Sequence, residues 1–289
     1  MQSFYKAESQ PLEGEVTAGG SVASSSSWYG SFRPKARSQL PPIFSSVLGR
    51  GADASSFDKR IRDADVSELL SIVKDGLPRF DEGNLVIAVC TAAKVVDDRS
   101  LSAMASNPSW LALLDRLNDA VPRLEPRGLS MVAYALAKMA WNKESILPEL
   151  ARASTEKAAD FSSTDVAKIC WAFAKLDFIE EALDFWQEMA NVVLKQAATA
   201  RHVELSMISW AFGVAQQGHR AMYAEIASCS LRKMQDLTPQ CLANIAVAFA
   251  RQKISDPELF AAISKRSRLL ISDFADFDVT NLCWAQACA

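Results

Sequence analysis

Basic, amide and aromatic side chains recur at regular intervals along this chain of 289 residues. In combination they have the chemistry of a nucleic-acid surface, because cations pair with phosphates, rings stack on bases and amides read base edges. The net charge is −3, so such a surface must be a local basic patch. The candidate RNA-binding residues are Lys94, Lys138, Lys168, Lys175, Arg251, Asn244, Asn281, Tyr134, Trp171, Trp210 and Trp284.

The aromatic candidates mark one position of an internal repeat, which we call the anchor. The basic candidates stand four residues after it, and the amides and Lys168 stand three residues before it. The anchor recurs in steps of 37 to 39 residues, a period typical of stacked helix pairs. It is occupied by Tyr134, Trp171, Trp210, Val247 and Trp284, and in a weaker copy by Cys90.

On a helical wheel the anchor lies roughly opposite an apolar stripe formed by the residues five and two before it and two after it. The candidate residues therefore share one helix face. A second interpretation remains open: the rings simply fill the space between repeats, and a basic residue in the last helical turn complements the helix dipole.

These patterns predict an all-α fold, an α-solenoid of about five to six helix-pair repeats over residues 57–289. We expect a first helix at residues 57–74 and extra helical turns at residues 101–117. Three polar residues stand where N-caps are needed, and two prolines stand at first helical positions. They are Asp81, Ser162 and Thr238, and Pro126 and Pro239.

Residues 1–56 are predicted to form a disordered tail, rich in serine, glycine and proline. Residues 16–52 lack acidic side chains, as transit peptides do, whereas Glu8, Glu13 and Glu15 argue against import, so both interpretations stay open. At the other end the last motif has no second helix, and we expect that the final repeat is truncated.

The sequence gives no indication of an enzyme, a metal site or a cofactor. It lacks paired CxxC ligands, a nucleophile elbow and a phosphate-binding loop, and it has two histidines. No apolar run approaches the roughly 18 residues of a membrane span. We therefore expect a binding protein with no membrane partner.

At Ile169–Leu176 the chain reads ICWAFAKL, and this motif resembles the repeats of organellar RNA-metabolism proteins. That group includes octotricopeptide and heptatricopeptide repeat proteins, FAST-kinase-like proteins with a RAP domain, and helical-repeat subunits of the mitochondrial RNA-editing substrate-binding complex. The resemblance implies binding of single-stranded organellar RNA in mitochondria or plastids, a role in RNA processing, editing or stability, and other RNA-processing proteins as partners. Val214, Val247 and Gln286 depart from the motif. The alternatives are a cytoplasmic location and a protein-interaction scaffold of armadillo-like shape.

Overall fold

A computed structural model describes residues 52–142 and 146–288 of the chain. All of the described residues belong to one compact unit of the chain. The predicted disordered tail therefore lies outside the described residues, except for its last five residues, which begin the first helix.

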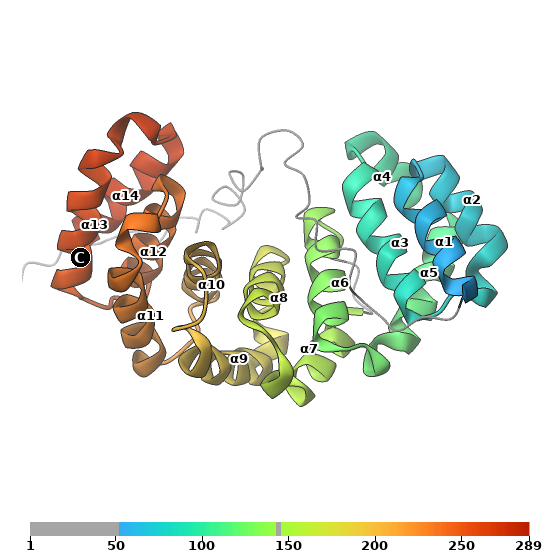
Figure 1. Cartoon of the computed structure of the whole chain (residues 1–289), viewed down its shortest axis with the longest axis horizontal. Helices are drawn as coiled ribbons and strands as arrows, with labels where there is room; N and C mark the ends of the chain where they lie inside the picture. Colours follow the sequence, from blue (N-terminus) through green and yellow to red (C-terminus); the bar gives the residue numbers. More distant parts are fainter. Residues whose placement is uncertain (1–51, 143–145, 289) are drawn as a thin grey trace, which may run out of the picture. The chain divides into compact units, whose positions relative to one another are not determined.

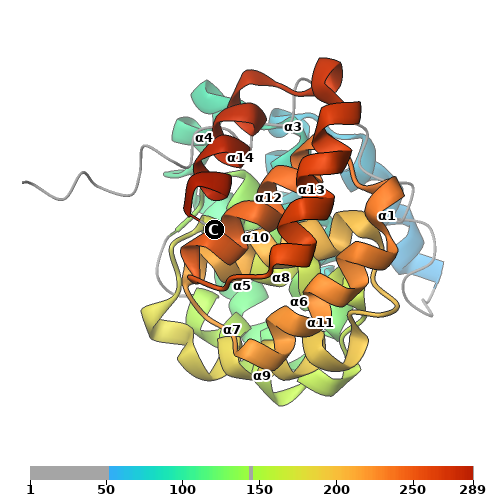
Figure 2. The same ribbon diagram turned by 90° about the vertical axis from the view of Figure 1, so that its left-hand side faces the viewer.

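The described part of the chain contains fourteen α-helices, and most of them fall into two layers (Figure 1). In each layer a helix packs against the next member of the same layer. Figure 2 shows the stack from its end. The A layer comprises α1 (Ala52–Asp63), α3 (Glu82–Val95), α6 (Pro126–Lys138), α8 (Ser163–Lys175), α10 (His202–Ala215), α12 (Pro239–Arg251) and α14 (Asp276–Cys288). The B layer comprises α2 (Val66–Gly76), α5 (Pro108–Ala120), α7 (Ile146–Glu156), α9 (Leu183–Gln196), α11 (Arg220–Arg232) and α13 (Pro257–Leu269). The predicted all-α solenoid is confirmed.

The A-layer helices begin where the cap residues predict. The side chains of Asp81, Ser162 and Thr238 each accept a hydrogen bond from the backbone N–H three residues on. Helices α6 and α12 begin at Pro126 and Pro239, where a missing N–H leaves no hydrogen bond unmade.

Four A-layer helices end in the same way, six residues after the anchor. The residue there has a positive φ of 51° to 57°, and the next N–H bonds back to the carbonyl five residues earlier. The bond from Trp141 N to Leu136 O, for example, is 2.9 Å long. This is the left-handed helix stop that usually carries glycine. Here it carries Ala140, Asp177, Gln216 and Lys253.

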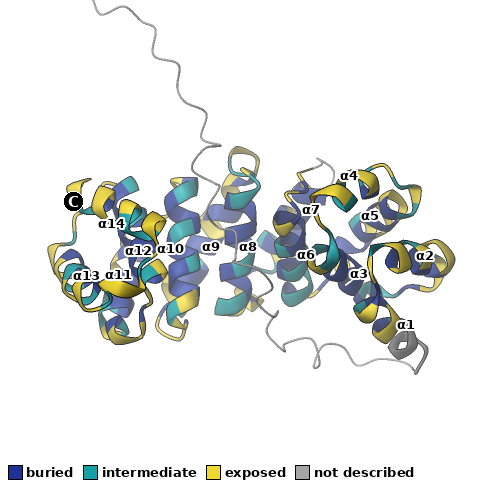
Figure 3. Cartoon of the chain, turned by 90° about the horizontal axis from the view of Figure 1, so that it is seen from above, coloured by how far each residue is buried: buried dark blue, intermediate teal, exposed yellow. Residues whose placement is uncertain are grey.

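The core lies between the two layers, and the predicted apolar stripe forms its A-layer side (Figure 3). In α6, α8, α10 and α12 every residue of the stripe is buried. Small residues let neighbouring A-layer helices approach closely. At Gly213 of α10 an added Cβ would lie 2.7 Å from the Cα of Ala248 in α12.

One predicted helix proved to be a pair of shorter ones. Residues 57–74 were expected to form one helix, but α1 ends at Asp63 and α2 starts at Val66. Asp65 and Glu68 form a capping box there, and these local hydrogen bonds outweigh the continuing apolar periodicity. The extra helical turns expected at residues 101–117 belong to α4 (Asp98–Met104) and α5, where Asn107 caps a helix that begins with Pro108.

Long polar side chains at the ends of B-layer helices link each repeat to the one before it. Lys157 donates through Nζ to the carbonyls of Pro122 and Leu124, at 2.8 and 2.7 Å. In the next repeats Gln196 donates to Phe161 O and Lys233 to Ala198 O, both at 2.9 Å. We call Lys157, Gln196 and Lys233 the bridging side chains.

Among the described helices, none is long and apolar enough to cross a lipid bilayer.

Candidate nucleic-acid interface

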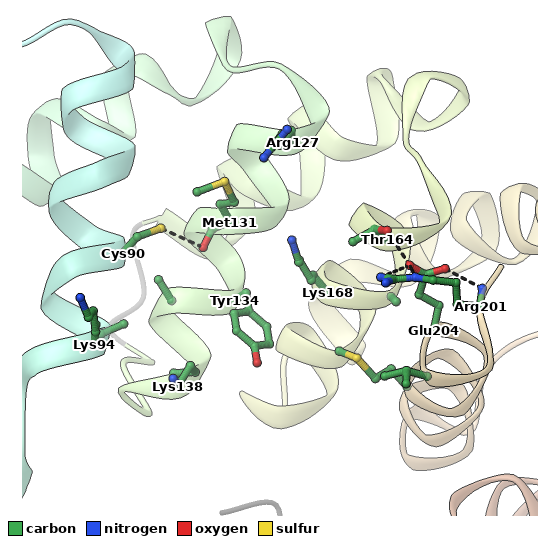
Figure 4. A pocket seen from close by; sticks show the side chains of 15 residues that line it. Cys90, Lys94, Arg127, Met131, Tyr134, Lys138, Thr164, Lys168, Arg201 and Glu204 are labelled. Atoms are coloured by element: carbon green, nitrogen blue, oxygen red, sulfur yellow. Dashed lines mark hydrogen bonds and ion pairs between the residues drawn. The ribbon is translucent and has the colours of Figure 1, made fainter. Parts of the chain in front are cut away.

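A cavity of about 200 Å³ opens on the face shared by α3, α6, α8 and α10 (Figure 4). We call it the basic pocket. Its lining combines cations, two methionines, one aromatic ring and small apolar side chains. The lining residues are Cys90, Ala93, Lys94, Arg127, Met131, Tyr134, Ala135, Lys138, Thr164, Ala167, Lys168, Arg201, Val203, Glu204 and Met207.

Helical geometry places the polar residues of the pocket. On α6, Arg127, Met131, Tyr134 and Lys138 follow one another at spacings of four, three and four residues, so they form one stripe along the helix. The same stripe on α8 supplies Thr164 and Lys168. Close packing of these two A-layer helices then brings the stripes together at one opening.

Positive charge dominates the pocket. Among the described residues that line it are five cations, Lys94, Arg127, Lys138, Lys168 and Arg201, and a single carboxylate, Glu204. The chain as a whole has a net charge of −3, so this is a local excess of positive charge.

Glu204 is engaged by its neighbours. Its carboxylate accepts hydrogen bonds from Thr164 Oγ1 at 2.5 Å and from the guanidinium of Arg201 at 2.7 Å. Burial alone would raise the pKa of Glu204, but the hydrogen bonds from Thr164 and Arg201 outweigh burial and lower it. The carboxylate is therefore ionised and forms an ion pair with Arg201.

Lys168 is the most constrained of these cations. Burial lowers the pKa of its ammonium group and is the largest effect; Asp165 opposes it, and the nearby Arg127 adds to it more weakly. Within the residues that the structure describes, Lys94, Lys138 and Lys168 form no ion pair. Three lysine ammonium groups thus remain available to an anionic ligand.

The other titratable groups of the pocket stay uncharged. Burial raises the pKa of the Cys90 thiol to about 12, and its sulfur lies 3.8 Å from the carbonyl oxygen of Met131. Burial also raises the pKa of the Tyr134 hydroxyl. A protonated thiol is a poor nucleophile.

The anchor aromatics form a ladder between neighbouring helices. The rings of Tyr134 and Trp171 are 5.1 Å apart, and those of Trp171 and Trp210 are 6.4 Å apart. Only 4% of the surface of Trp171 is exposed, so the ring has no free face for a base. Trp171 therefore fills the space between neighbouring repeats. Tyr134 differs because it also borders the pocket.

The remaining candidates lie outside the pocket. Asn244 is 6% exposed, and its amide donates to Ser206 Oγ at 3.1 Å, so it links α12 to α10 and is not presented to a ligand. Burial lowers the pKa of Lys175, which is half-buried like Arg251 and Asn281. Trp284 on α14 is 42% exposed.

The structure thus brings together Lys94, Lys138, Lys168 and Tyr134 of the residues that the repeat pattern singled out. Sequence reasoning missed Arg127, Thr164, Arg201 and Glu204. Arg127 and Thr164 occupy the position seven residues before the anchor, one helical turn before the amide position on the same face.

No three His, Cys, Asp or Glu side chains lie close enough together to hold a metal ion in the ranges that the structure describes.

The stacked helix pairs define the chain as an α-helical-repeat protein. A family model described as RNA-editing substrate-binding complex 6 protein matches residues 85–288. The chain belongs to that family, which confirms the resemblance to the helical-repeat subunits of the editing complex. A search of curated proteins found no match.

Proposed function

We propose that the protein binds single-stranded organellar RNA through the basic pocket and acts in RNA editing. The observation that carries the proposal is the excess of cations in the pocket, with three lysines free of ion pairs on a chain of negative net charge. Cations placed in this way pair with phosphates.

The family supports this role, since its name describes a complex that binds the substrates of RNA editing. It also supports a location in mitochondria, or in plastids, and other subunits of such a complex as partners. We assign the chain a binding role and no catalytic one.

The experiment compares two triple variants that change the net charge equally. In the pocket variant Lys94, Lys138 and Lys168 become glutamate. In the matched control Lys74, Lys195 and Lys265 become glutamate, all exposed lysines on the B-layer helices α2, α9 and α13. Affinity for single-stranded RNA is measured over a series of salt concentrations, and circular dichroism checks the fold.

We expect the pocket variant to lose RNA binding, and the control to retain most of it. Each lost phosphate contact reduces the slope of log affinity against log salt by about 0.7 on single strands, so the slope should fall by about 2. Equal affinity of the two variants would contradict the proposal.

A second candidate is a protein-interaction scaffold. Large apolar side chains are exposed on and between α13 and α14, and such patches mark protein interfaces. They are Leu269, Ile271, Phe277 and Trp284. Salt separates the two functions: binding to phosphates weakens steeply as salt rises, whereas apolar contacts do not.

A further inference from the structure

We propose that the basic pocket receives one unpaired RNA base, while the cations around it hold the phosphates on either side. This inference rests on the proposed function. It deepens that function because it distinguishes a site that grips a nucleotide from a surface that only attracts the backbone.

The size of the cavity indicates a small apolar group. At about 200 Å³ it is smaller than the roughly 300–1,000 Å³ of sites for drug-sized ligands. A single nucleobase is flat and smaller than a drug-sized ligand, so its size suits a cavity of this volume. A base in a duplex is stacked and paired, so only single-stranded RNA can offer one.

The interior of the pocket has the chemistry that a base prefers. Met131, Met207 and Ala167 provide apolar lining, and the ring of Tyr134 borders the same cavity. Bases stack on aromatic rings, and methionine packs well against flat rings because its thioether is polarisable. Since burial raises the pKa of Tyr134, its hydroxyl stays protonated beside the bound base.

The cations lie on two sides of this interior. In Figure 4, Lys94 and Lys138 lie on one side of Tyr134, whereas Lys168 lies on the other side with Arg127 above it. A compact anion would call for cations that converge on one point. Cations on both sides of an apolar cavity fit an RNA chain, in which phosphates flank each base. They fit an acidic peptide less well, because such a peptide has no flat ring between its carboxylates to fill the cavity.

The test uses a bulky substitution that fills the pocket and keeps its charge. Met131→Trp places an indole where the base would lie, and Met207→Trp does so from α10 should the first variant fold poorly. Leu194→Trp on the B-layer helix α9 is the control, because Leu194 is exposed and lies outside the pocket.

Three probes are compared at one salt concentration: a short adenylate oligonucleotide, a base-free ribose-phosphate chain of equal length, and an oligoglutamate peptide. We expect the wild-type protein to bind the adenylate about tenfold more tightly than the base-free chain, within the range that one stacked base contributes. Met131→Trp should remove that difference and leave affinity for the base-free chain unchanged. Leu194→Trp should behave as wild type.

The outcomes separate this inference from the function on which it rests. Equal binding of adenylate and base-free chain would overturn base insertion and leave RNA binding standing. Failure of both to bind would overturn the proposed function as well. Oligoglutamate binding as tightly as adenylate would overturn the assignment of the pocket to RNA and favour an acidic protein partner.

Discussion

Lys168 holds a positive charge where burial disfavours it. Its neighbours Arg127 and Asp165 act in opposite directions, and the pKa of the ammonium group stays below that of an ordinary lysine. In the free protein this charge is a source of instability. A bound phosphate would remove that instability. A role in binding anions therefore explains a lysine at this buried position.

We therefore expect Lys168→Met to stabilise the free protein and weaken RNA binding. The unfolded chain keeps this proton up to the ordinary lysine pKa of 10.5, and the folded chain releases it at lower pH. The wild-type protein should therefore gain stability relative to Lys168→Met as pH increases through the lowered pKa towards 10.5, since the buried cysteines and tyrosines that titrate in the same range are common to both proteins.

Urea unfolding at several pH values measures this effect, and RNA titration over a salt series should show a slope lower by about 0.7. Lys195→Met is the control, since Lys195 is exposed on α9. Equal stability of Lys168→Met and wild type at every pH would contradict the argument.

Only part of the pocket could be predicted from residue spacing. Lys138, Tyr134 and Lys168 follow the anchor periodicity, and the same stripe extended by one turn reaches Arg127 and Thr164. Arg201 and Glu204 stand at the N-cap and third positions of α10, which the repeat pattern marks only as a helix start. The burial of Trp171 could not be predicted either, because a helical wheel gives the direction of a side chain but not the distance to the next helix.

At the scale of single helices, the left-handed stop after α12 carries a lysine where glycine is usual. Lys253 has a φ of 53° and is exposed. An L-residue in this conformation is less stable than glycine, so Lys253→Gly should raise the free energy of unfolding by about 0.5–1 kcal/mol. The same change at Lys265, inside α13, should lower it by about 1 kcal/mol. Denaturant unfolding measures the free energy of unfolding of the two variants. A change of the same sign in both would refute the explanation.

Gly213 tests the close approach of α10 and α12. Gly213→Ala would force a Cβ against the backbone of Ala248, and we expect a loss of about 1–3 kcal/mol in unfolding free energy. Gly128→Ala on α6 is the control. Its Cβ would meet the nearest atom at 3.5 Å, an ordinary contact, so alanine should be neutral or stabilising there. A tolerated Gly213→Ala would show that the two helices can move apart freely.

The helix starts were predictable because capping is local, as Asp81, Thr238 and Pro126 show. The division between α1 and α2 was also within reach, since Asp65 and Glu68 form the capping-box pattern. Apolar periodicity continues across this division and therefore does not reveal it. The extra helix α4 also begins with a capping box, formed by Asp97 and Ser100.

For the whole molecule, the bridging side chains should matter to stability and not to RNA binding. Lys157→Met removes two hydrogen bonds from carbonyls of the preceding repeat, and for a half-buried residue we expect a loss of about 1 kcal/mol. RNA affinity should stay unchanged, since Lys157 lies outside the basic pocket. A parallel loss of RNA affinity would place Lys157 in the binding surface.

The bridging side chains also bear on how the structure comes apart. In a helical-repeat array the cooperativity of unfolding depends on the contacts between neighbours. Lys157, Gln196 and Lys233 each donate a hydrogen bond from the end of a B-layer helix to a backbone carbonyl of the preceding repeat. Opening one of these repeats breaks hydrogen bonds of the next, so we expect the backbone amides of α6 to α11 to exchange with solvent as one block, with a single protection level.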